Sequence, residues 1–271
     1  MSFLVHVLLW GGALIGIVVL GIFVLSTYAN ITYDRFLISH ALPVELEQLM
    51  AFGAPIPRHN GTSTRVVPLD CPKEKVRPLL MEYWCIGDEA SAKARLHGLI
   101  AGGLREHCEP HFKAVQSNEE PPADFEDFDI ADLDAAKELW LAKGLPEEAV
   151  SSCRSMAAFD YVRAADLART CHYAGFLDEP LMWRCIAWSA YRARSEFDSW
   201  EHYAASFLLG RSAYYGVERL ERMTDALVDL LGDSEGGLLG SKYPHLWQTY
   251  PLAKIQVPER MLHGDLLHDL S

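Results

Sequence analysis

Three charged residues inside apolar helical stripes are the best candidates for chemistry in this chain of 271 residues. Asp160 and Arg163 lie on the apolar face of one predicted helix, and Arg211 lies on the apolar face of another. A buried charge is costly unless it is paired. We therefore expect Asp160 to meet Arg163, Arg211 or both.

This candidate cluster has two interpretations. The arginines could bind a carboxylate or phosphate as a fork, with Phe159, Trp200 and Tyr214 as aromatic neighbours. The same charges could instead form a buried tie that fixes the register of the helices without chemistry. No hydrolase, P-loop or dinucleotide-binding signature accompanies them. We therefore favour the tie and assign no catalytic residue.

Metal and cofactor sites are not indicated. His107 and His111 are four positions apart, but Pro110 lies between them and no further ligand has a familiar spacing. The six cysteines contain no CxxC pair. Cys171 and Cys185 fall in helical apolar stripes, which is typical of small buried thiols. We expect neither a metal nor a cofactor.

The charge balance narrows the choice of partner. The formal net charge is −13, which argues against nucleic acid because phosphate backbones attract basic surfaces. A basic protein partner is compatible with it. Half of the residues are hydrophobic and 11% are aromatic, so the chain can bury a substantial core.

The helices that would position the cluster lie in a predicted core at residues 146–231, and clear start and stop signals mark their ends. Gly175 is typical of a helix C-terminus, and Asp178 followed by Pro180 is typical of a helix start. Asp198 with Glu201 fits a capping box that opens the third helix. The sequence therefore predicts three consecutive helices around the cluster.

The flanking segments complete a helical domain at residues 73–271. Two helices are expected at residues 73–108, the second capped by Asp88, and another at residues 130–142. An acidic linker is expected near residues 117–134. The tail after residue 231 keeps several apolar residues, including Trp247, and should pack back onto the bundle. Residues 30–72 read as a juxtamembrane helix, broken near Pro43, and an irregular connector.

The N-terminus predicts a single transmembrane anchor, at residues 1–29. Residues 3–25 are apolar apart from His6, and a membrane-spanning helix needs about 20 such residues. A cleaved signal peptide would have a basic start and a shorter apolar run. Gly12 and Gly16 have the spacing of a helix-packing motif, which could support a homodimer. Arg35 follows the segment and no basic residue precedes it, which favours a cytoplasmic domain.

Several short motifs occur in order along residues 69–216. They are Ala158-Phe159-Asp160-Tyr161-Val162-Arg163, Ala168-Arg169, Gly175-Phe176, Glu179, Ser199-Trp200 and Leu209-Gly210-Arg211, with Leu80–Ile86 and Leu96–Arg105 before them. This pattern resembles the bacterial domain-of-unknown-function family 1266. Phe159 stands where the family pattern has Trp, and the N-terminal anchor is an addition to it.

The resemblance implies an all-helical domain without an established activity. Similar domains occur near secreted toxins and their neutralising partners, and a bacterial protein with the predicted anchor would lie at the inner membrane. The expected fold is thus all-α, a transmembrane helix followed by a helical bundle. The expected function is that of a membrane-anchored, non-enzymatic interaction module, such as an immunity or accessory protein that binds a toxin or other bacterial effector.

Two alternatives to this function stay open at the level of sequence. The first is an enzyme or a small-anion-binding domain that uses the Asp/Arg cluster. A cleft that exposes Asp160, Arg163 and Arg211 would favour it, and their complete burial would exclude it. The second is a membrane scaffold that dimerises through Gly12 and Gly16.

Overall fold

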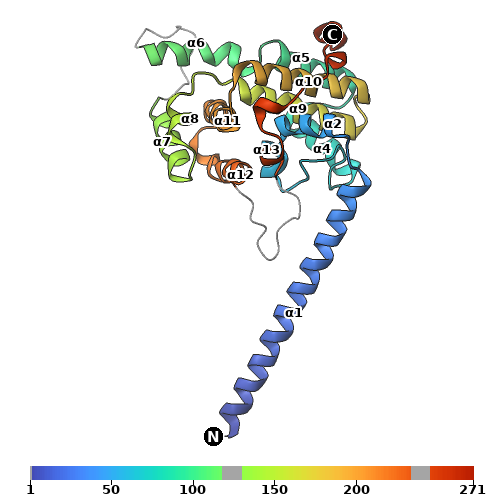
Figure 1. The fold of residues 1–271 in the computed structure, drawn as a ribbon, viewed down its shortest axis with the longest axis vertical. Helices are drawn as coiled ribbons and strands as arrows, with labels where there is room; N and C mark the ends of the chain where they lie inside the picture. Colours follow the sequence, from blue (N-terminus) through green and yellow to red (C-terminus); the bar gives the residue numbers. More distant parts are fainter. Residues whose placement is uncertain (1, 118–129, 233–244) are drawn as a thin grey trace. The chain divides into compact units, whose positions relative to one another are not determined.

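A computed structural model describes residues 2–117, 130–232 and 245–271 (Figure 1). The side chains of residues 2–17, 111, 115, 116, 130–132 and 218 lie outside the description. Two units are present. One contains helix α1 (Ser2–Ser39), and the other contains the described residues from Leu42 onward. The candidate site lies wholly in the second unit.

Helix α1 requires a correction of the predicted fold class. In its described part, the apolar run ends at Leu25, and polar side chains such as Ser26, Thr27 and Asn30 follow. Within the described residues, no helix is both long enough and apolar enough to cross a membrane. This finding overturns the predicted transmembrane anchor over residues 3–25.

The all-helical prediction is confirmed, since no strand occurs among the described residues. The helices of the second unit are α2 (Val44–Met50), η1 (Ala51–Gly53), α3 (Pro55–His59), α4 (Lys73–Trp84), α5 (Glu89–Ala101), α6 (Gly103–Ser117), α7 (Ile130–Ala142), α8 (Glu147–Ser151), α9 (Ala157–Ala174), α10 (Glu179–Glu196), α11 (Trp200–Tyr215), η2 (Val217–Arg219), α12 (Glu221–Leu231), α13 (Leu246–Thr249), η3 (Leu252–Lys254), η4 (Glu259–Met261) and α14 (Leu266–Asp269). Helix α7 has the predicted bounds. Most of the predicted acidic linker near residues 117–134 lies outside the described residues, as do the surroundings of Gly12 and Gly16.

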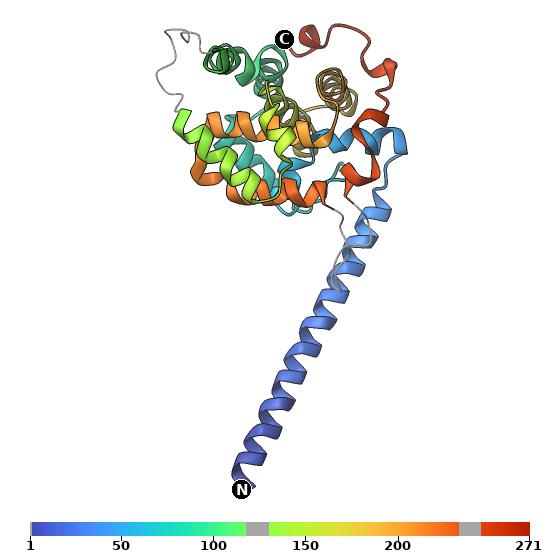
Figure 2. The same cartoon turned by 60° about the vertical axis from the view of Figure 1, so that its left-hand side comes forward.

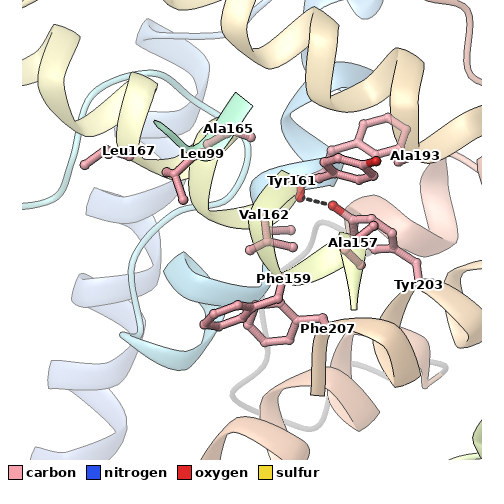
Figure 3. Close-up of a cluster of buried hydrophobic side chains, with 14 of the residues drawn as sticks. Leu99, Ala157, Phe159, Tyr161, Val162, Ala165, Leu167, Ala193, Tyr203 and Phe207 are labelled. Atoms are coloured by element: carbon pink, nitrogen blue, oxygen red, sulfur yellow. Dashed lines mark hydrogen bonds between the residues drawn. The ribbon is translucent and has the colours of Figure 1, made fainter. Parts of the chain in front are cut away.

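Helix α9 lies at the centre of the second unit. It packs against the long helices α10, α11, α5, α4 and α6 and against the short elements η1 and α3 (Figures 1 and 2). Many of its buried residues are alanines, which allow neighbouring backbones to come close. Phe159 fills the space between α9 and α11, with its ring centroid 5.7 Å from that of Phe207 (Figure 3). The helix that carries Asp160 is therefore buried on nearly all sides.

Most of the predicted helix ends are confirmed. Asp88 and Asp178 cap α5 and α10 through their side chains, and Gly175 ends α9 at a φ of 82°. The start of α11 differs from the prediction, because Ser199 caps it instead of Asp198. Both residue types accept backbone hydrogen bonds well, so the sequence left the position ambiguous by one residue.

The predicted connector before residue 73 is not simply irregular. Phe52 is fully buried in η1, and α3 follows it. The buried Arg169 side chain donates to the backbone carbonyls of Ser63, Val67 and Pro68 at 3.0 Å or near it, which ties the remaining loop to α9. The predicted connector, although rich in proline and glycine, therefore contributes buried residues to the core.

The C-terminal tail packs against the N-terminal end of α11, where Trp200 lies. Trp247 stacks on Trp200 with ring centroids 4.9 Å apart and an interplanar angle of 5°. Its indole Nε1 donates to the carbonyl of Ala51 at 2.8 Å, and Trp200 Nε1 donates to the carbonyl of Tyr250 at 2.8 Å. Ile255 further along is also buried. The tail thereby joins η1 and α11 in one core.

Candidate functional site

Asp160 is the most buried charged residue of the predicted cluster, with none of its surface exposed. Its carboxylate accepts hydrogen bonds from the backbone N–H groups of Leu104 at 2.9 Å and Arg105 at 3.0 Å. These residues open α6, whose first N–H groups have no partner within the helix. Asp160 thus caps α6 from α9, where the helix dipole also favours a negative charge.

Gly103 makes this cap possible. Its φ of +63° lies in the left-handed region that favours glycine. A Cβ at this position would lie only 2.3 Å from the carboxylate carbon of Asp160. The turn between α5 and α6 therefore needs a residue without a side chain in order to receive the carboxylate.

Two arginines compensate the charge of Asp160. Arg105 Nη1 lies 3.3 Å from Oδ2, and Arg163 Nη1 lies 3.8 Å from Oδ1. Burial raises the pKa of Asp160, and the two backbone N–H donors and both guanidinium groups oppose that rise. The pairing of Asp160 with Arg163 is as predicted, whereas Arg211 does not pair with Asp160.

Arg105 is the residue that sequence reasoning missed. Besides its ion pair, it donates to the carbonyls of Leu99 at 3.2 Å and Ile100 at 2.9 Å. Its guanidinium also lies over the rings of Tyr161 and Trp188, at 5.3 and 5.8 Å from their centroids. The available signal was its place just after the Gly102-Gly103 break, where a helix start brings backbone donors together with its side chain.

Arg163 is enclosed by aromatic rings. Its guanidinium carbon lies 4.7 Å from the ring centroid of Phe159 and 5.0 Å from those of Trp84 and Tyr214. Burial lowers the pKa of Arg163, and Asp160 opposes this effect. Phe159 and Tyr214 are thus neighbours of the cluster as predicted. Trp200 is not, because it packs against the C-terminal tail.

Arg211 lies apart from this tie. Its guanidinium lies over the ring of Tyr215 at 4.9 Å, and its buried Nε has no hydrogen-bond partner among the described residues. The preceding Gly210 has a separate packing role. A Cβ there would lie 2.5 Å from the Cβ of Phe159, so α11 approaches α9 closely at this point. The Gly–Arg pair therefore combines a packing position with a cation that the Asp160 tie does not use.

Two hollows in the described part of the chain lie away from Asp160. A cavity of about 10 Å³ lies beside Asp166 and Arg169, and a groove of about 240 Å³ runs between Trp188 and the C-terminal tail. Neither is lined by Asp160. No group of potential metal ligands occurs among the described residues. The geometry at Asp160 is that of a charged tie between α6 and α9.

Together these features define a class of protein: an all-helical domain in which one buried carboxylate caps a second helix. The family model described as "Protein of unknown function (DUF1266)" matches residues 79–251, and the chain belongs to this family. No curated protein and no solved structure matches the chain. The family match extends beyond the resembling region at residues 69–216 to include α12 and Trp247.

Proposed function

We propose that this chain is a non-enzymatic interaction module that binds a protein partner through one surface. We call this the Arg–aromatic surface, and it consists of Trp84, Arg163, Tyr214 and Tyr215. Its most concrete version is an immunity or accessory protein that binds and blocks a bacterial effector. A basic effector would be attracted by a chain with a formal net charge of −13.

The composition and exposure of this surface support the proposal. Tyr214 and Tyr215 remain 52% and 46% exposed, although their rings pack edge to face at 4.7 Å. Arg163 connects Tyr214 to Trp84, which is partly exposed at the end of α4. Binding hot spots in protein interfaces are enriched in Trp, Tyr and Arg. The single observation that carries the proposal is this exposed pair of tyrosines on a rigid arginine–aromatic base.

Rigidity adds to the argument. Phe159 packs against Tyr214 with ring centroids 5.9 Å apart, and Arg163 is held by Asp160 beneath. Side chains that are already ordered lose little conformational entropy on binding. The tie at Asp160 therefore serves the surface by fixing the cation on which its aromatic rings pack.

The complete burial of Asp160 argues against an enzyme that uses this carboxylate. Both of its oxygens already accept hydrogen bonds from α6, which leaves none directed to a substrate. The dimerising scaffold depended on the transmembrane anchor, so we do not propose it.

A paired substitution tests the proposed function. The chain is affinity-purified from its own host, and co-purified proteins are identified by mass spectrometry. We expect one stoichiometric partner, and we expect Tyr214→Ala combined with Tyr215→Ala to lower its recovery about tenfold or more, as for loss of a hot spot. Tyr191→Ala is the matched control, because Tyr191 on α10 is 53% exposed. Equal recovery with all three proteins would contradict the proposed surface.

A further inference from the structure

A group of basic side chains near the C-terminal end of α11 takes no part in the interactions of Asp160. We propose that His59, Arg211, Arg219 and Arg222 form a binding site for the phosphoryl group of a small molecule. We call this group the basic cluster. The inference does not rest on the proposed protein-binding function, although the guanidinium of Arg211 packs on Tyr215 of the Arg–aromatic surface.

Four elements bring the basic cluster together. Arg211 lies in the last turns of α11, Arg219 ends η2 directly after it, and Arg222 lies in the first turn of α12. Helix α12 packs against α3, whose last residue is His59. The packing of α3 against α12 thus places an imidazole beside arginines that are far from it in the sequence.

The pKa shifts of His59 and Arg211 agree with the placement that the contacts of α3, α11, η2 and α12 give. Burial lowers the pKa of His59, and the charges of Arg211 and Arg222 lower it further. Burial likewise lowers the pKa of Arg211, and Arg219 acts in the same direction. Burial is the largest cause of both shifts. At His59 a backbone hydrogen bond with Arg222 acts against the lowering of the pKa, and at Arg211 the nearby Tyr215 hydroxyl does so.

The described acidic residues nearby are engaged elsewhere. Asp229 on α12 pairs with Arg58 at 2.5 Å and with His245 at 3.0 Å. Glu221 and Asp225 on the same helix pair with Lys143 at 3.0 and 2.9 Å. Among the described side chains, which do not include that of Glu218 in η2, no ion pair reaches the three arginines of the basic cluster. In a chain with 37 acidic residues and 24 basic ones, this is an unusual local excess of positive charge.

The charge of the basic cluster indicates the chemical class of its ligand. Three guanidinium groups beside an imidazole whose pKa is lowered match a phosphoryl dianion better than a single carboxylate. The buried atoms Arg211 Nε and His59 Nδ1 both lack a hydrogen-bond partner within the described structure. A bound oxyanion that drew these side chains toward it would relieve both deficits. Arg211 and His59 are only partly exposed, which favours a small ligand over a large one.

Nuclear magnetic resonance of the full chain tests this inference, with inorganic phosphate as the probe. The His59 ring signal is assigned from its loss in His59→Gln and followed during a phosphate titration at constant ionic strength, balanced with chloride. We expect a saturable shift, because a bound anion stabilises the protonated imidazole. Arg222→Gln removes an exposed guanidinium and should weaken phosphate binding about tenfold.

A control variant and two other anions, chloride and acetate, show whether the binding is specific to phosphate. Arg192→Gln on α10 is the control, because this arginine pairs with Glu196 at 2.8 Å and should leave phosphate binding unchanged. A shift that does not saturate, or one that chloride alone reproduces, would overturn the site. Acetate that binds as tightly as phosphate would overturn the phosphoryl assignment. The phosphate titration and the recovery of a protein partner are separate measurements. If the Tyr214 and Tyr215 substitutions do not change the recovery of a partner, the result of the phosphate titration still stands.

Discussion

Asp160 concentrates several interactions in one carboxylate. It accepts two backbone N–H bonds from α6 and faces two guanidinium groups from α6 and α9. A buried charge with this many partners is stable only as a complete set, because removal of one member leaves the others uncompensated. The residue should therefore affect stability far more than an exposed acid does.

We expect Asp160→Asn to lower the free energy of unfolding by about 3–5 kcal/mol, because Arg105 and Arg163 would lose their buried counter-charge. The asparagine keeps the shape but presents one oxygen and one amide nitrogen to the two N–H donors. Urea denaturation measures the loss. Asp134→Asn is the control, since Asp134 forms only an exposed pair with Lys137 on α7. Equal unfolding midpoints for wild type and Asp160→Asn would contradict the role of the tie.

Asp166, a second acidic residue of α9, should make the free energy of unfolding depend on pH. Burial raises the pKa of Asp166 to about 6, while Arg169 opposes the rise. The folded state then binds more protons than the unfolded state between the two pKa values, so this group's contribution destabilises the fold increasingly from about pH 4 to pH 6 and stays constant above. Asp166→Asn should thus be more stable than wild type by about 1–3 kcal/mol at pH 7.5.

Unfolding measurements of both proteins across this pH range isolate the contribution of Asp166. The two free energies of unfolding should approach each other below about pH 3, where the carboxyl is largely protonated in both states. A constant difference from pH 4 to pH 7.5 would show that Asp166 keeps an ordinary pKa in the fold.

At the scale of elements, the contact between α9 and α11 depends on one missing side chain. Glycine in a helix is normally less favourable than alanine by about 1 kcal/mol. At Gly210 the usual order should reverse, because the added Cβ would lie 2.5 Å from the Cβ of Phe159. We expect Gly210→Ala to lower the free energy of unfolding by about 1–3 kcal/mol, the usual cost of overpacking.

Gly98→Ala in α5 provides the matched control. A Cβ at Gly98 would meet nothing within 4 Å, so this substitution should stabilise the protein by about 0.5–1 kcal/mol. Thermal unfolding of both variants gives the comparison. A gain in stability from both would mean that α9 and α11 can move apart without cost.

The same elements show what the sequence could predict. The caps at Asp88, Gly175 and Asp178 were predictable because a cap is a local feature, set by residue type and spacing within a few positions. The burial of Asp160 was predictable from its place in an apolar stripe. Its partner Arg105 was not, because that contact joins α9 to a helix start 55 positions earlier in the sequence. The separation of Arg211 from Asp160 depends equally on tertiary packing.

For the second unit as a whole, the core is closed by segments outside the central helices. Phe52 from η1 packs on Trp200 of α11, with ring centroids 5.0 Å apart, and Trp247 packs on the same indole. Phe52 lies before the family match, which begins at residue 79. We infer that the segment before the match belongs to the same folding unit, because its aromatic residue completes a shared cluster.

Trp247 provides the decisive test of this closure. Trp247→Ala would remove a buried indole that stacks on Trp200 and would leave the carbonyl of Ala51 with only the N–H of Ala54 as a donor. We expect the free energy of unfolding to fall by about 3–5 kcal/mol, as for other large-to-small substitutions of buried aromatic residues. Tyr83→Ala is the control, because Tyr83 is exposed and should change stability little. Hydrogen exchange of the Trp247→Ala variant should also show faster exchange in η1 and at the start of α11, since both border the vacated space. Protection that is lost only in the tail would mean that the tail covers a core already closed without it.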